Sequence, residues 1–160
     1  MKTMTEQSVI HNTFVIERSY SVAPERVFAA FADPAKKRRW FAEGHHHDVE
    51  QFEMDFRTGG VERSRYRFRE GTPFPGVAMT SEGTYQDIVS NQRIVIAATM
   101  AIGDKRISVA LATFEFLPTE KGTELILTHQ AAFFEGADGP TMRQDGWRKI
   151  LDRLPTEIGN

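Results

Sequence analysis

The sequence contains no cysteine, which excludes disulfide bonds, thiolate catalysis and cysteine-bound zinc or iron–sulfur centres. It also lacks any apolar run near the ~20 residues that a membrane-spanning helix needs. The first residues, MKTMTEQSVIHNTF, lack the apolar stretch of a secretory signal peptide. Neither sign of charge dominates, because 20 lysines and arginines are balanced by 22 acidic residues. We therefore expect a cytoplasmic protein that binds neither membranes nor nucleic acid.

The length of 160 residues is typical of one domain. The mostly polar residues 1–11 are expected to form a flexible N-terminus, followed by a single domain over residues 12–158. Aromatic residues are unevenly distributed, with 12 Phe against 3 Tyr and 2 Trp. Phenylalanine adds bulk without a polar group, so this composition fits either a large core or the lining of an apolar cavity.

The spacing of apolar residues predicts an α+β domain. Period-two alternation indicates seven strands, and helical spacing indicates two short helices after the first strand and a long C-terminal helix. The expected strands lie in residues 12–22, 49–57, 61–70, 77–89, 93–102, 106–117 and 123–133, and the expected helices in 23–34, 34–41 and 141–154. Short turns between most strands predict a meandering antiparallel sheet, whose core face the last helix would cover. Pro155 should end or kink this helix, and Gly146 should let it approach the sheet closely.

Four segments carry a family resemblance: FVIERSYSVAPERVFAAFADPAKKRRWF, DFRTGGVERSRYRF, GTELILTHQAAF and DGWRKILDRL. In this order they resemble successive motifs of the START-like (SRPBCC) helix-grip superfamily. The branch is similar to the domain homologous to the C-terminal part of the heat-shock protein 90 ATPase activator. The resemblance runs from about Thr13 to Leu154 and implies a curved seven-stranded antiparallel sheet wrapped around a long C-terminal helix. The eukaryotic activator has an additional N-terminal domain that this sequence does not contain, so the resemblance supports the shared module.

The resemblance leaves three functions open, because this superfamily includes lipid carriers, cyclases, receptors and co-chaperones. We favour a non-enzymatic module that holds a small hydrophobic or aromatic molecule between the last helix and the sheet. One alternative is an interaction protein that stimulates a chaperone ATPase, and another is cyclase- or hydrolase-like catalysis in the cavity. We expect no cofactor, and either a monomer or a homodimer.

The inward-facing residues are expected either to fill the core or to line this cavity. The candidates for the lining are Trp40, Phe52, Met54, Tyr66, Phe68, Met79, Tyr85, His129 and Trp147. The hydroxyls of Tyr66 and Tyr85 would then orient a mainly apolar ligand. His129 shares a strand face with Leu125 and Leu127, which is typical of a hydrogen-bonded core histidine; an acid–base role in the cavity is the alternative.

A row of arginines projects from one face of the strand VERSRYRFRE. A three-residue loop, Thr58 to Gly60, would place Asp55 opposite Arg63, Glu53 opposite Arg65 and Phe52 opposite Tyr66. That pairing predicts a solvated face of ion pairs. Arg67 and Arg69 receive no partner in it, so they are candidates for an anion or protein-partner site.

Three consecutive histidines, His45 to His47, precede the second predicted strand. Neighbouring residues of an extended segment point to opposite sides, so three in a row do not converge on one metal ion. His45 and His47 share a side and would need further ligands. We therefore expect no metal site and favour a solvated loop near the rim of the cavity.

Overall fold

The computed structural model describes residues 8–159 of the 160-residue chain. Its strands form one antiparallel sheet in the order β1-β7-β6-β5-β4-β3-β2. They are β1 (Ile10–Tyr20), β2 (His47–Met54), β3 (Val61–Phe68), β4 (Ala78–Val89), β5 (Arg93–Ile102), β6 (Lys105–Pro118) and β7 (Thr123–Phe133). Apart from the pairing of β1 with β7, all neighbouring strands are also consecutive in sequence, as short turns predict.

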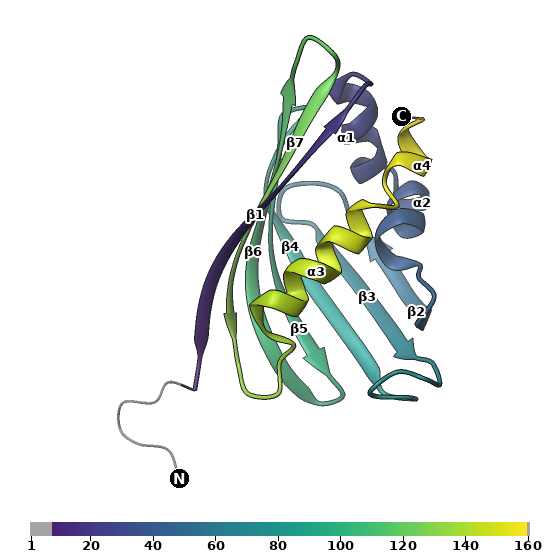
Figure 1. Ribbon diagram of the computed structural model, residues 1–160, viewed down its shortest axis with the longest axis vertical. Coiled ribbons are helices and arrows are strands. Elements are labelled where there is room, and N and C mark those ends of the chain that lie inside the picture. The colour runs from purple at the N-terminus through teal and green to yellow at the C-terminus, as the bar shows by residue number, and fades with distance from the viewer. Residues whose placement is uncertain (1–7, 160) are drawn as a thin grey trace.

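The helices all lie on one side of the curved sheet (Figure 1). They are α1 (Pro24–Ala32), α2 (Pro34–Lys37), a π-helical turn η1 (Arg38–Ala42), α3 (Gly139–Leu151) and α4 (Pro155–Ile158). Helix α3 runs diagonally across the concave face, and α1 covers one end of the sheet near the C-terminus (Figure 1). The predicted α+β helix-grip fold is confirmed. No helix within residues 8–159 is both long and apolar enough to cross a bilayer.

Proline and aspartate set the helix boundaries. Pro24 occupies the first turn of α1, and Asp33 caps α2 by accepting hydrogen bonds from the backbone nitrogens of Ala35 and Lys36, at 2.9 and 3.4 Å. The last predicted helix ends earlier than expected, at Leu151. A turn follows, and Pro155 begins α4 in a new direction because its ring cannot continue the preceding helix.

The hydrophobic core occupies the half of the molecule beneath α1 and α4. Phe31 lies at its centre, with its ring centroid 4.7 Å from that of Trp40, 5.0 Å from that of Phe114 and 5.1 Å from that of Phe116. These rings are buried together with residues from the faces of β1 and β7. Close aromatic packing therefore fills this half of the molecule, whereas a cavity remains between α3 and the sheet.

The register of β2 against β3 differs from the prediction. Glu53 lies opposite Arg63 and Phe52 opposite Ser64, and the register shifts again between Val49 and Gln51. The connecting loop takes six residues, 55–60, instead of three, because Phe56 leaves the strand and packs on Phe28 and Tyr85. The pairs assigned from sequence (Asp55 with Arg63, Glu53 with Arg65, Phe52 with Tyr66) are therefore wrong.

The domain also begins earlier in the sequence than predicted. Strand β1 begins at Ile10, which pairs with Phe133, so residues 10 and 11 belong to the sheet and not to a flexible N-terminus. Of the rest of the predicted flexible segment, residues 8 and 9 precede the strand, and residues 1–7 lie outside the described residues. Apart from the end of β2, which comes three residues early, the remaining boundaries of the strands agree with the prediction to within about two residues, the usual scatter of strand ends.

Candidate ligand-binding site

A cavity of about 260 Å³ lies between α3 and the concave face of the sheet. Its wall combines aromatic and aliphatic side chains with a small number of charged ones. Strands β2 to β7 contribute one side, with only His47 from β2, and α3 with the α2–η1 segment contributes the other. The wall includes Lys37, Phe41, His47, Glu62, Tyr66, Met79, Ser108, Phe114, His129, Asp138, Met142, Arg143, Gly146, Trp147, Ile150 and Arg153.

A buried ion pair forms part of the wall near α2. The Nζ atom of Lys37 lies 2.8 Å from Oε1 of Glu62, which also accepts a hydrogen bond of 2.7 Å from the hydroxyl of Tyr85. Lys37 Nζ also lies 4.5 Å from the centre of the Phe41 ring, a cation–π contact. Burial, followed by the Glu62 charge, raises the pKa of Tyr85, so this hydroxyl stays protonated and remains a donor.

A second buried ion pair lies where α3 begins. Arg143 donates to both carboxylate oxygens of Asp138, at 2.7 and 2.8 Å, and to the hydroxyl of Ser108, at 3.0 Å. Its guanidinium carbon lies 5.0 Å from the centre of the Phe133 ring. The planar guanidinium matches the carboxylate in a bidentate geometry, which fixes the start of α3 on β6 and β7.

His129 projects from β7 into this cavity and is 2% exposed. Its ring stacks on Phe14 at 4.5 Å, and its Nδ1 is one of two buried side-chain atoms in residues 8–159 without a hydrogen-bond partner. Burial, and then the nearby Arg143, lowers the pKa of His129 to about 4. The imidazole is therefore neutral at pH 7 and can both donate and accept a hydrogen bond.

Tyr66, His47 and Arg153 line the cavity near the end of α3. The rings of His47 and Tyr66 are 4.6 Å apart, and Nε2 of His47 lies 2.6 Å from the carbonyl oxygen of Ala42. Because a carbonyl can only accept, this nitrogen carries the proton. Burial raises the pKa of Tyr66 to about 12, so its hydroxyl is neutral.

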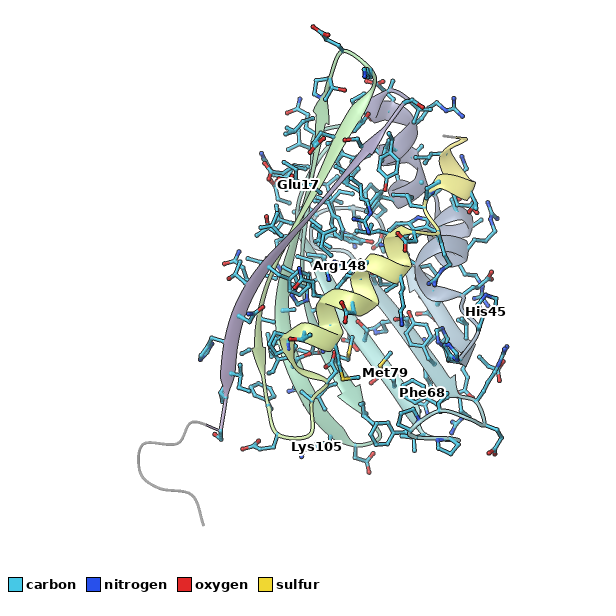
Figure 2. All side chains as sticks on the ribbon, viewed as in Figure 1. Glu17, His45, Phe68, Met79, Lys105 and Arg148 are labelled. Atoms are coloured by element: carbon cyan, nitrogen blue, oxygen red, sulfur yellow. The ribbon has the colours of Figure 1, made fainter. Side chains whose placement is uncertain are left out.

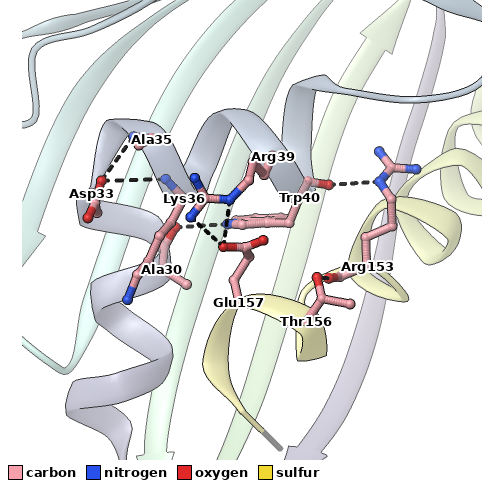
Figure 3. Close-up of polar contacts among 9 residues, drawn as sticks. All are labelled: Ala30, Asp33, Ala35, Lys36, Arg39, Trp40, Arg153, Thr156 and Glu157. Atoms are coloured by element: carbon pink, nitrogen blue, oxygen red, sulfur yellow. Dashed lines mark hydrogen bonds and ion pairs between the residues drawn. The ribbon is translucent and has the colours of Figure 1, made fainter.

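Arg153 reaches this group from the turn that follows α3. Its Nε donates to the carbonyl oxygen of Trp40, at 3.1 Å (Figure 3). In the same region Arg39 of η1 forms an ion pair with Glu157 of α4, at 2.8 Å (Figure 3). These two contacts fasten the C-terminal segment to η1 and so fix the position of Arg153 beside the cavity.

Comparison with known proteins identifies the family of this chain. The family described as "Activator of Hsp90 ATPase homolog 1-like protein" matches residues 21–159. The chain belongs to this family. No curated protein matches the chain significantly, so the family membership rests on the family match and on solved structures.

Three solved structures illustrate the breadth of the Activator of Hsp90 ATPase homolog 1-like fold. A protein from Rhizobium loti is 45% identical, with a TM-score of 0.83, covering 95% of this chain and 100% of that chain. A putative uncharacterized protein from Rhizobium leguminosarum is 34% identical, with a TM-score of 0.87 and coverage of 95% and 97%. The AHSA1 protein from Silicibacter pomeroyi is 26% identical, with a TM-score of 0.72 and coverage of 92% and 98%.

Within this family fold, four of the nine residues predicted to line a cavity do so: Tyr66, Met79, His129 and Trp147. Met79 lies on the side of the sheet that carries α3 (Figure 2). That these residues bind a ligand stays a prediction.

The other five cavity candidates require correction, because they do not contribute to the wall: Trp40, Phe52, Met54, Phe68 and Tyr85. Trp40 and Tyr85 are 0% and 1% exposed and belong to the core cluster. Phe52 and Met54 lie on the edge strand β2, and Phe68 lies at the end of β3, where it packs against Phe74. Strand alternation identified the inward face, but it does not show how far along the sheet α3 extends.

Sequence reasoning missed the charged members of the wall, above all Lys37, Glu62 and Arg143. The signal was present for Glu62, because period two places it on the same face as Tyr66. A carboxylate on a buried face requires a cation, so the alternation itself indicates an ion-pair partner. Lys37 and Arg143 carried no such signal, since Lys37 lies in the basic run 36–39 and Arg143 lies in a helix with other charged residues.

Gly146 does not have the role predicted from the sequence, which was to let the last helix approach the sheet closely. Beyond its chain neighbours and the backbone of its own helix, a Cβ atom added to this glycine would meet no atom within 4 Å, and the residue lines the cavity. Gly146 therefore leaves open space between α3 and the sheet and does not serve a close approach. It enlarges the cavity beside Trp147.

The histidine run divides into two parts. His45 and His46 are exposed, and His45 lies at the outer edge of the molecule away from α3 (Figure 2). His47 begins β2 and lines the cavity, so the expected solvated loop ends one residue earlier. Within residues 8–159 no group of three or more histidine, aspartate or glutamate side chains is placed to hold a metal ion.

The predicted charge-paired face of β3 is confirmed, with other partners than those assigned. Arg65 and Arg67 share Glu50, at 3.0 and 2.8 Å, and Arg69 pairs with Asp48 at 2.7 Å. The bulge at Glu50 brings its carboxylate between the two arginines. Arg67 and Arg69 therefore have carboxylate partners, although the register predicted from the sequence gave them none.

Proposed function

We propose that this protein is a non-enzymatic binding module for a small, mainly apolar molecule held between α3 and the sheet. The observation that carries this proposal is the cavity of about 260 Å³, which an otherwise close-packed fold leaves beneath α3. Protein interiors are normally packed as densely as organic crystals, so a void of this size costs stability. A bound molecule would restore the lost contacts.

The volume limits the size of the ligand. An apolar cavity of about 150 Å³ accommodates benzene, so 260 Å³ suits a body of about two fused rings. The wall supports a planar body, because rings of Phe41, Tyr66, Phe114 and Trp147 border it. Ligand sites of this kind combine apolar walls with a few polar groups that fix orientation, and here these are His129, Tyr66 and the charged side chains.

Tryptophan fluorescence provides a direct test, because the two tryptophans differ in position. Trp147 lines the cavity, whereas Trp40 is fully buried in the core and donates a hydrogen bond to the carbonyl oxygen of Ala30. We expect 2-naphthalenemethanol and 2-naphthoate, as probes, to raise the melting temperature and to change the tryptophan emission. The emission change should disappear in Trp147→Phe and persist in Trp40→Phe. If neither probe binds, the proposed function is wrong.

A second candidate function, stimulation of a chaperone ATPase, is supported by family membership alone. The row of arginines on β3 supports it less than the sequence suggested, since each of Arg65, Arg67 and Arg69 has a carboxylate partner. The discriminating measurement is ATP turnover by a purified heat-shock protein 90 with and without this protein. Unchanged turnover would exclude stimulation.

A further inference from the structure

The charged side chains on the cavity wall do not balance. Apart from the histidines, the wall carries three cations, Lys37, Arg143 and Arg153, and two carboxylates, Glu62 and Asp138. Lys37 is paired with Glu62 and Arg143 with Asp138. Arg153 has no ion-pair partner in the part of the chain that the structure describes, so the wall has one positive charge in excess.

The bonds of Arg153 leave its outer nitrogens available. The recorded hydrogen bond of the side chain uses Nε, which donates to the carbonyl oxygen of Trp40 (Figure 3). A guanidinium has five N–H donors in a planar fork, so both Nη groups can bind a further acceptor. Burial lowers the pKa of Arg153. The cation is therefore partly desolvated, and it lines the same cavity as the neutral hydroxyl of Tyr66.

We propose that the ligand of this cavity is a monoanion with a ring-sized apolar body, whose carboxylate binds Arg153 and the hydroxyl of Tyr66. Its apolar body would extend along α3 against Trp147 and Met79, away from Arg153. This inference rests on the proposed function, because it names the class of molecule that the same cavity binds.

The other cations are poor alternatives for the anionic group. Lys37 Nζ is enclosed by Glu62 and by the rings of Phe31, Trp40 and Phe41. Arg143 already forms a bidentate pair with Asp138. A single uncompensated charge fits a singly charged group better than a phosphate dianion, and the planar guanidinium fits a carboxylate through two parallel hydrogen bonds.

The experiment compares matched probes at pH 7.5. We would measure the binding of 2-naphthoate, 2-naphthalenemethanol and decanoate by calorimetry, with tryptophan emission as a second readout. 2-Naphthoate and 2-naphthalenemethanol share the same ring system and differ in charge. Only the naphthoate is charged, because a carboxylic acid with a pKa near 4 is ionised at this pH. We expect the naphthoate to bind at least about tenfold more tightly than the alcohol, which is about 1.4 kcal/mol, and more tightly than decanoate.

Variants of Arg153 and of a control arginine test which residue binds the carboxylate of the ligand. Arg153→Gln should reduce the preference for naphthoate over the alcohol to less than about twofold, chiefly by weakening the binding of naphthoate. Arg148→Gln is the matched control: this exposed arginine of α3 pairs with Asp145 and does not line the cavity, so the preference should be retained. If Arg153→Gln does not fold, Tyr66→Phe tests the same subsite and should also reduce the preference.

The outcomes separate the two proposals. Equal binding of the acid and the alcohol would overturn the anion inference and leave the proposed function standing. A preference for the acid that survives both Arg153→Gln and Tyr66→Phe would show that the carboxylate binds elsewhere, and tighter binding of decanoate than of naphthoate would contradict the ring-sized body. The absence of binding by all three probes would overturn the proposed function itself.

Discussion

The Nζ atom of Lys37 lies 2.8 Å from Oε1 of Glu62, and the two side chains are 7% and 9% exposed. This contact joins α2 to β3, and the hydroxyl of Tyr85 extends it to β4. Removing one member of such a pair leaves a buried charge without compensation, whereas replacing both by apolar residues removes the cost of desolvation.

Lys37→Met should therefore lower the free energy of unfolding by about 3–5 kcal/mol. The double variant Lys37→Met/Glu62→Leu should recover much of this loss, although Tyr85 then loses its acceptor. Urea denaturation would measure both effects. Arg148→Ala, which breaks the exposed pair with Asp145, serves as the control and should change stability by less than about 1 kcal/mol. Equal effects of Lys37→Met and Arg148→Ala would contradict the role assigned to the buried pair.

His129 predicts a loss of stability in mild acid. Its pKa is about 4 in the folded protein, because burial disfavours the imidazolium, against 6.5 for an unperturbed histidine. Between these values the unfolded chain binds a proton that the folded protein does not, so stability falls as the pH is lowered from 6.5 towards 4. At pH 5 the contribution is about 2 kcal/mol.

The comparison for this prediction is His129→Phe, which keeps a ring against Phe14 and removes the titration. Unfolding free energies measured at pH 7.5 and pH 5 should differ less in this variant than in the unmodified protein, by about 2 kcal/mol. The four other histidines remain as a common background. An identical pH dependence in both proteins would mean that His129 is protonated in the folded state at pH 5.

Gly146 predicts opposite effects on stability and on binding. A glycine inside a helix costs about 1 kcal/mol relative to alanine, and a Cβ at this position meets open space. Gly146→Ala should raise the free energy of unfolding by about 0.5–1 kcal/mol. Gly146→Leu should fill part of the cavity and weaken the binding of 2-naphthoate.

A second glycine provides the contrast. A Cβ at Gly83 would lie 2.7 Å from Cδ1 of Ile96, so Gly83→Ala requires Ile96 to move and should destabilise the protein. Thermal unfolding of both alanine variants would distinguish these effects. Stabilisation by Gly83→Ala together with destabilisation by Gly146→Ala would invert the expectation and show that the open space lies elsewhere.

The ion pairs of β3 predict that its arginines do not contribute to the cavity. Arg67→Glu combined with Arg69→Glu would place like charges beside Glu50 and Asp48 and should lower the melting temperature. The affinity for 2-naphthoate should stay unchanged, because neither arginine lines the cavity. If a chaperone ATPase responds to the unmodified protein and not to this variant, the two arginines form a partner site after all.

Much of the fold could be predicted because its signals are local. The period-two runs that form β4, β5 and β7 specify strands whatever lies across from them. Pro24, Asp33 and Pro155 mark helix boundaries through their own backbone chemistry. The hairpin between β2 and β3 was mispredicted because Phe56 follows a non-local preference, its packing on Phe28 and Tyr85.

The candidate site shows the same division. The sequence by itself determined which face of each strand points inward, and hence that Tyr66, Met79 and His129 belong to the interior. Only the tertiary structure decided which interior residues fill the core and which border a cavity, because that depends on where α3 crosses the sheet. It also decided the pairing of the charges, since Lys37 and Glu62 are 25 residues apart in sequence. Alternation follows from the geometry of a single strand, but the balance of charge in a cavity depends on which segments meet there.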